Sequence, residues 1–208
     1  MDRGRLEAFS DGVFAVAITL LVLNLAVAPP GSESLAHLLS EKGAGFLAYV
    51  FSFFTIGIIW VNHHALVSNV AVVTRLLLFL NLLLLLFVVL LPFATGTVAD
   101  YLSGGTEADA ELAVAVYGIV LFGMSIGFGL MLEWSLRDGH TIVPVPRDQH
   151  WAARRRFAAG GLFYLLVIGL AFVSAPAAFA LSGLVAVYYV FEWTPAITGG
   201  PPDDSAPR

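Results

Sequence analysis

The sequence predicts an all-α integral membrane protein with six transmembrane helices per subunit, and both its composition and its uncharged runs support this fold class. Hydrophobic residues make up 59% of the 208 positions and charged residues 12%, whereas soluble proteins average about 25% charged residues. The net charge of −5 argues against a nucleic-acid-binding protein. The chain contains no cysteine, which excludes disulfides, thiol catalysis and thiolate metal sites.

Uncharged runs of membrane-spanning length recur along the chain, since about 20 apolar residues cross a hydrocarbon core of about 30 Å. Four of them are predicted to span once each: Gly12–Ala28, Phe46–Thr74, Leu76–Ala99 and Leu112–Leu132. A fifth run, Phe157–Phe191, is too long for one span. We expect it to break at Ser174-Ala175-Pro176, because proline disfavours helix at the residue before it. One six-helix membrane domain is therefore expected over residues 1–193, followed by a disordered cytoplasmic tail over residues 194–208.

The basic residues predict the orientation of these helices. Nine of the ten fall on one side of a six-span topology: Arg3, Arg5, Arg75, Arg137, Arg147, Arg154, Arg155, Arg156 and Arg208. Only Lys42 falls on the other side. The positive-inside rule then places both termini on the cytoplasmic side of the cell (inner or plasma) membrane. The cluster Arg154-Arg155-Arg156 is most simply a topology anchor, and it could also contact anionic lipid headgroups.

The end of the first apolar run has an alternative interpretation. Ala26-Val27-Ala28 resembles a signal-peptidase site, but the acidic residues Asp2, Glu7 and Asp11 are unfavourable for a signal peptide. We expect Pro29-Pro30-Gly31 to end the first span instead.

Few polar groups lie within the predicted spans, and each has a structural and a functional interpretation. Ser10 or Asp11 could cap the first helix, or both could join Arg5 in a charge-assisted network with the second span. In that span, Trp60 is either an interfacial anchor or a partner in the network. Asn81, early in the third span, either only stabilises helix packing through an interhelical hydrogen bond or is a partner in the same network.

Two adjacent histidines, His63 and His64, follow Trp60 and Asn62. Adjacent residues on a helix point about 100° apart, so these two are poorly placed to bind one metal ion, and no third ligand is suitably spaced. We expect one of them to bond Ser10 or Asp11 instead.

The first span also carries a stripe of apolar side chains. Val16, Leu20 and Leu23 fall on one helix face with Thr19 beside them. The stripe is either a surface that touches lipid or another helix, or a hydrophobic constriction around a water-filled path. The spacing fits both.

These motifs together resemble one known family. Arg5-x-x-x-Phe9-Ser10-Asp11 and the helix after it, followed by Trp60-Val61-Asn62-His63-His64 and Leu80-Asn81, are similar to the bacterial branch of the transmembrane protein 175 family of potassium channels. The resemblance covers the first half of the chain by motif and the rest by length and span count. That family lacks a glycine-rich carbonyl filter, and so does this chain.

The resemblance implies a homotetramer of six-helix subunits whose first helices line a pore for monovalent cations. By position, the constriction would fall at Val16, with Leu20 and Leu23 as further rings and Thr19 as a ring of hydroxyls. A network bracing the pore helix would comprise Arg5, Phe9, Ser10, Asp11, Trp60, Asn62, His63 and Asn81. Relatives often carry isoleucine or leucine where this chain has Val16. The smaller side chain could widen the constriction, move the gate to Leu20 or Leu23, or weaken potassium selectivity.

Two other functions fit the sequence less well. A secondary transporter could use Asp11 and His63 as a proton relay, although no charged residue lies near the middle of any span. A membrane scaffold without transport activity would need no special residues. An enzyme is not expected, because no paired carboxylates, nucleophile with base, or metal cluster can be recognised. No cofactor is expected beyond the permeant potassium ion.

Overall fold

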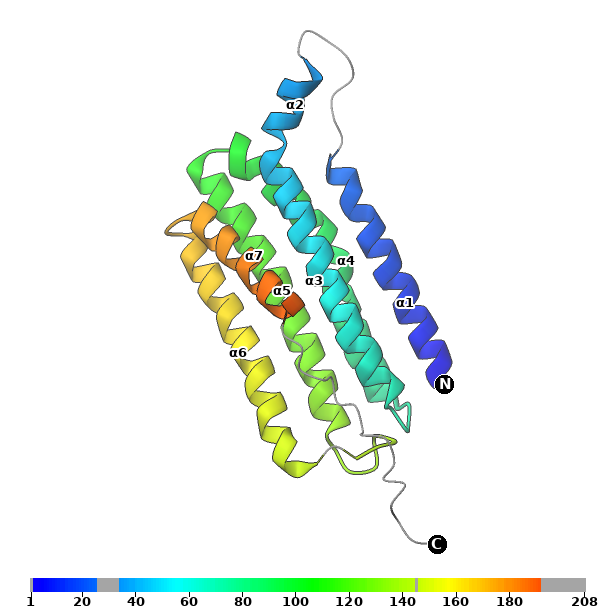
Figure 1. The fold of residues 1–208 in the computed structure, drawn as a ribbon. Coiled ribbons are helices and arrows are strands. Elements are labelled where there is room, and N and C mark those ends of the chain that lie inside the picture. Colours follow the sequence, from blue (N-terminus) through cyan, green and yellow to red (C-terminus); the bar gives the residue numbers. More distant parts are fainter. Residues whose placement is uncertain (1, 26–33, 145, 192–208) are drawn as a thin grey trace, which may run out of the picture.

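The computed structural model describes residues 2–25, 34–144 and 146–191, and all the longer secondary-structure elements in them are helices (Figure 1). Seven α-helices and one short 3₁₀ helix follow one another along the described chain: α1 (Arg3–Leu20), η1 (Leu21–Leu25), α2 (Leu35–Glu41), α3 (Gly43–Ser68), α4 (Arg75–Gly104), α5 (Glu107–Ser135), α6 (Arg147–Ala171) and α7 (Ala175–Phe191). The all-α prediction is confirmed. The segment Ala26-Val27-Ala28 that resembles a signal-peptidase site, the expected end of the first span at Pro29-Pro30-Gly31 and the expected tail lie outside the described residues.

Four helical stretches are long and apolar enough to cross a membrane: Arg3–Leu25, Gly43–Ser68, Arg75–Gly104 and Glu107–Ser135. They correspond to the first four predicted spans. The fifth predicted run is divided as expected, because α6 ends at Ala171 and α7 begins at Ala175. Pro176 lies in the first turn of α7, where a missing backbone N–H breaks no helical hydrogen bond. The described apolar part of α7 is shorter than the four long helices, and the six-span count stays a prediction.

The beginning of α1 differs from one of the two interpretations of its sequence. The helix starts at Arg3 with Asp2 as its N-cap residue, so the suggestion that Ser10 or Asp11 caps it is wrong. The segment from Arg3 to Asp11, which carries charged side chains, forms about two helical turns before the apolar run. Ser10 and Asp11 consequently lie inside the helix, where their side chains can contact neighbouring helices.

The end of α3 also differs from the predicted span Phe46–Thr74. The helix ends at Ser68, and the connection after it pairs with the segment between α5 and α6. Asn69 holds this pairing: its Nδ2 donates to the Val143 carbonyl over 3.1 Å, and the Val143 N–H donates to its Oδ1 over 2.9 Å. Hydropathy could not locate this break because the residues of the connection are mostly apolar.

The helix α4 lies between α1, α3 and α5 and packs against all three. Its buried side chains recur at helical spacing from Leu77 to Val98. On the facing side of α5, Gly127 allows close approach, since a Cβ atom there would lie 2.8 Å from the Leu84 Cα atom. Close contact through small residues is the usual way in which membrane helices associate.

Polar side chains also link the core helices. The hydroxyl groups of Ser52 on α3 and Thr95 on α4 are 2.7 Å apart, and Ser52 is 3.1 Å from the hydroxyl of Tyr117 on α5. All three side chains are buried. Because an unpaired polar group in an apolar interior costs free energy, such a bridge fixes the three helices in one arrangement.

Candidate functional site on the first helix

The helix α1 and its continuation η1 have one buried and one exposed side. Phe14, Ala17 and Leu21 are at most 1% exposed. On the other side, Val16 is 55%, Leu20 41% and Leu23 66% exposed, and Thr19 is exposed beside them. The predicted stripe therefore lies on the exposed surface of the described subunit. Lipid or another copy of the chain can cover it.

Thr19 is the only hydroxyl-bearing residue among the exposed positions from Val16 to Leu23. Its Oγ1–H donates to the Val16 carbonyl oxygen over 2.8 Å. The hydroxyl proton is thus used within the helix, which leaves the lone pairs of the oxygen available. A hydroxyl held in this way can present an oxygen to a cation.

On its buried side, α1 is joined to α3 and α4 by a small polar network. Asn81 Nδ2 on α4 donates to Ser10 Oγ over 3.1 Å, and Ser10 Oγ donates to the Leu6 carbonyl over 2.9 Å. His63 Nε2 on α3 lies 2.7 Å from Asn81 Oδ1. Ser10, His63 and Asn81 are each at most 1% exposed. The three predicted residues therefore meet at one buried point between three helices. The expected bond from one of the histidines to Ser10 or Asp11 is wrong, because His63 pairs with Asn81 and His64 with Glu7.

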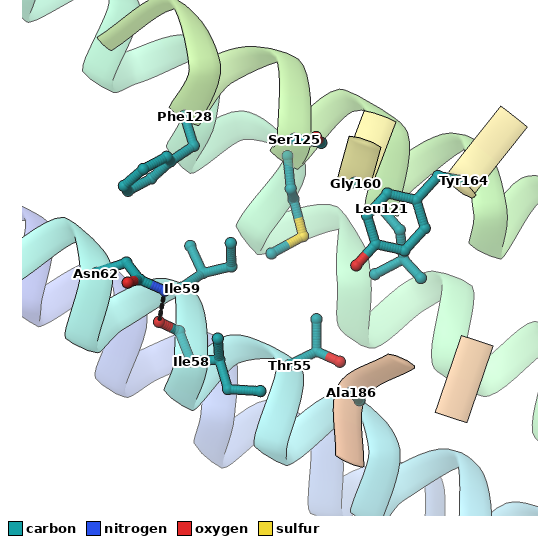
Figure 2. Close-up of a pocket in the computed structure, with 11 residues that line it drawn as sticks. Thr55, Ile58, Ile59, Asn62, Leu121, Ser125, Phe128, Gly160, Tyr164 and Ala186 are labelled. Carbon is teal, nitrogen blue, oxygen red and sulfur yellow. Dashed lines mark hydrogen bonds between the residues drawn. The ribbon is translucent and has the colours of Figure 1, made fainter. Parts of the chain in front are cut away.

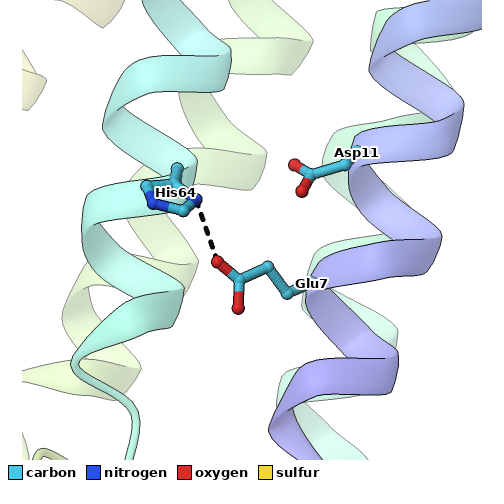
Figure 3. A group of neighbouring side chains, drawn as sticks. All are labelled: Glu7, Asp11 and His64. Atoms are coloured by element: carbon cyan, nitrogen blue, oxygen red, sulfur yellow. Dashed lines mark ion pairs between the residues drawn. The ribbon is translucent and has the colours of Figure 1, made fainter.

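A second group of polar contacts lies beside this network and is more open to solvent. Trp60 Nε1 donates to Asp11 Oδ1 over 2.9 Å. One turn earlier on α1, Glu7 Oε1 lies 2.9 Å from His64 Nδ1 on α3 (Figure 3). Both contacts join α1 to α3 at the end of the bundle where the chain begins.

Three residues expected in the network are not joined to it. Arg5 is exposed and forms no hydrogen bond or ion pair with any other described residue. Phe9 is 51% exposed. Asn62 Nδ2 donates to the Ile58 carbonyl of its own helix.

Three other contacts of α1 and η1 were not predicted from the sequence. Arg3 Nη1 donates to the Ser68 carbonyl over 2.7 Å, and Asn24 Nδ2 donates to the Pro92 carbonyl over 2.9 Å. The Glu7–His64 contact is the third. Only Glu7 carried a usable signal, because its position four residues before Asp11 places two carboxylates on one helix face. The first helix is thus held to the bundle at both ends and in the middle.

A cavity of about 60 Å³ lies elsewhere in the bundle, between α3, α5, α6 and α7 (Figure 2). Its wall is mostly apolar and includes the side chains of Thr55, Asn62 and Ser125. No residue of α1 lines it. The cavity is therefore separate from the exposed stripe and from the polar contacts of the first helix.

Spanning helices, interhelical polar bonds and an exposed first helix define an integral membrane protein of the helical-bundle class. Comparison with known proteins then gives the family. The sequence profile of the family described as "Endosomal/lysosomal potassium channel TMEM175" matches residues 5–92. A potassium channel from Streptomyces collinus is 46% identical over 95% of this chain and 96% of its own length. The chain belongs to the TMEM175 family.

Further relatives support the same assignment. A potassium channel from Chamaesiphon minutus is 32% identical over 92% of this chain and 95% of its own length. The crystal structure described as a lysosomal potassium-selective channel TMEM175 homologue from that organism superimposes with a TM-score of 0.79, at 33% identity, over 90% of this chain and 96% of that chain. The family is one of ion channels, so membership confirms that the chain is not an enzyme.

Proposed function

We propose that this protein is a potassium channel of the cell membrane in which copies of the first helix line a shared pore. The relatives from Streptomyces collinus and Chamaesiphon minutus are named potassium channels, which supports potassium as the permeant ion. The observation that carries the proposal is the exposed stripe on α1 and η1. Val16, Leu20 and Leu23 are exposed in the subunit although the opposite side of the same helix is buried.

A single helix cannot enclose water, so conduction requires several copies around one axis. A homotetramer of six-helix subunits, with α6 and α7 as the fifth and sixth spans, is the proposed assembly. The narrow point would lie at Val16, because a ring of branched apolar side chains can exclude water from a pore and so close it. Leu20 and Leu23 would form further apolar rings, and Thr19 would place hydroxyl oxygens beside them for a modest selectivity for potassium.

The polar contacts of α1 would serve to brace this pore helix. Ser10, His63 and Asn81 form its buried anchor, and Asp11 with Trp60 forms a second one. A helix that lines a gate must keep its rotation about its own axis, because a turn of 100° would replace one residue by its neighbour. Hydrogen bonds on the buried side hold that rotation without occupying the pore.

The proposed orientation has both termini in the cytoplasm, as the distribution of basic residues suggests. Within the arginine cluster before the fifth span, Arg154 forms a bidentate contact with Glu133, at 2.8 and 2.7 Å. Arg155 is exposed and is the better candidate to contact an anionic headgroup. The side chain of Arg156 lies outside the described residues.

The decisive experiment is a reversal-potential measurement on purified protein in planar bilayers with potassium on one side and sodium on the other. A modestly potassium-selective channel predicts a current that needs no proton gradient and whose reversal potential is shifted from zero in the direction that a higher potassium than sodium permeability requires. A proton-coupled transporter would instead give uptake driven by a pH gradient and abolished in Asp11→Asn. The structure offers no observation in favour of that relay, since Asp11 bonds Trp60 and His63 bonds Asn81.

A further inference from the structure

Glu7, Asp11 and His64 form a cluster that the proposed pore does not use. Glu7 and Asp11 lie one turn apart on α1, and His64 faces them from α3 (Figure 3). One ligand atom from each side chain can be chosen so that all three lie within 4.8 Å of one another. Ligand atoms around a tetrahedral ion with bonds of about 2.0–2.1 Å are about 3.3 Å apart. The three atoms would have to approach one another by about 1.5 Å or less, the difference between 4.8 Å and about 3.3 Å, to surround one ion.

The charges of this cluster are unbalanced. Two carboxylates four residues apart on a helix repel each other, and no arginine or lysine among the described residues forms an ion pair with either of them. The imidazole of His64 is their one opposing group there, and it is 53% exposed. A divalent cation would balance both carboxylates at once, which a single imidazole cannot do.

The donor set indicates which cations fit. An imidazole nitrogen suits zinc and similar transition metals, whereas magnesium and calcium prefer oxygen ligands alone. Three protein ligands with a position left to water is a common arrangement for zinc. The Trp60 indole also donates to Asp11 Oδ1, which orients this carboxylate and leaves its other oxygen available. Such outer hydrogen bonds are typical supports of metal ligands.

We propose that Glu7, Asp11 and His64 bind one divalent transition-metal ion of the zinc type per subunit, and that the ion links α1 to α3. Glu7 is 25% exposed, so the ion can enter from solvent. If α1 lines the pore, which is the function proposed above, the ion would tie the N-terminal, cytoplasmic end of the pore helix to α3 and change the current. Metal binding itself does not depend on that function.

The test uses the full chain, purified in detergent with its affinity tag removed and treated with a chelator. Co²⁺ is added while the visible absorption bands of the bound ion are recorded, and Zn²⁺ is then used to displace it. We expect about one Co²⁺ per subunit, displaced by stoichiometric Zn²⁺ and unaffected by millimolar Mg²⁺. Glu7→Gln and His64→Gln should each abolish the bands. Trp60→Phe, which removes only the outer hydrogen bond, should weaken binding by about tenfold.

His37→Gln is the matched control, because His37 is an exposed histidine on α2, away from the cluster. It should bind Co²⁺ as the wild type does. Absence of Co²⁺ bands in the wild type would overturn the proposal, and so would bands that survive in both Glu7→Gln and His64→Gln. Displacement by Mg²⁺ would show a carboxylate site without the histidine and would also overturn it. Potassium current is measured separately, so the channel proposal can fail while metal binding stands, and the reverse.

Discussion

The Nε2 atom of His63 lies 2.7 Å from the Oδ1 atom of Asn81, and neither side chain is more than 1% exposed. The other end of the same amide donates to Ser10 on the first helix. One asparagine thus joins α1, α3 and α4 at a point from which water is excluded. If the amide were lost, His63 Nε2 would be left buried without a hydrogen bond, and Ser10 would keep only its bond to the Leu6 carbonyl. We therefore expect this residue to be the most sensitive polar position in the bundle.

We therefore expect Asn81→Leu to destabilise the protein by roughly 1–3 kcal/mol, because it leaves the buried His63 Nε2 unpaired. The measurement is thermal or denaturant unfolding of the purified protein in detergent. Asn62→Leu is the matched control, because Asn62 bonds only the carbonyl of its own helix at Ile58, and it should change stability little. Equal stability of the Asn81→Leu variant and the wild type would refute the role of the amide.

The close approach of α4 and α5 gives a second prediction. Gly127→Ala places a Cβ atom 2.8 Å from the Leu84 Cα atom, and backbone cannot move aside cheaply. We expect a loss of about 1–3 kcal/mol, as is typical of overpacked cores. Gly129→Ala, two residues along the same helix, meets nothing within 4 Å and should be neutral or slightly stabilising through helix propensity. The pair is compared by unfolding under identical conditions.

A third prediction concerns the proposed constriction. Val16→Asn should raise potassium flux into liposomes severalfold, because a polar ring would stay hydrated where an apolar ring excludes water. The control is Val89→Asn on α4, where the valine is 44% exposed but outside the proposed pore. Unchanged flux through properly assembled Val16→Asn protein would place the constriction elsewhere.

The hydroxyl of Thr19 gives a fourth prediction. Thr19→Val keeps the shape of the side chain and removes the oxygen, so we expect a lower permeability ratio of potassium to sodium, read from the reversal potential. Thr97→Val on α4 is the control. Its hydroxyl makes the same kind of bond, to the Ala94 carbonyl over 2.8 Å, and its loss should leave the ratio as it is. Identical ratios in both variants would exclude Thr19 from selectivity.

Much of the fold could be predicted from the sequence because a helix that crosses the hydrocarbon core needs an apolar run of about 20 residues. Four runs correspond to helices of spanning length, and Pro176 marked the break between α6 and α7. The end of α3 could not be predicted, since the connection after Ser68 is held by Asn69 and a segment more than 70 residues away. The start of α1 was also misplaced in one interpretation, because charged residues before an apolar run look like a flank rather than helix.

The candidate site was predictable in its residues but not in its pairings. Ser10, His63 and Asn81 were selected as polar groups in apolar surroundings, and the structure brings these three together. Arg5, chosen as a charged group before the first span, and Asn62, chosen from the family resemblance, stand apart, since residue type and position do not fix a partner. The Glu7–His64 contact was missed because it depends on how α1 and α3 are rotated against each other, which no local pattern determines.

The central claim is that copies of the first helix meet around one axis with Val16 facing inward. The chain contains no cysteine, so a single Val16→Cys substitution can be tested by oxidative cross-linking in liposomes without background. We predict disulfide-linked dimers for Val16→Cys and only monomers for Leu162→Cys, whose side chain is 69% exposed on α6. Monomers for Val16→Cys together with dimers for Leu162→Cys would contradict the account, because α1 would then face lipid and α6 would face the neighbouring copy.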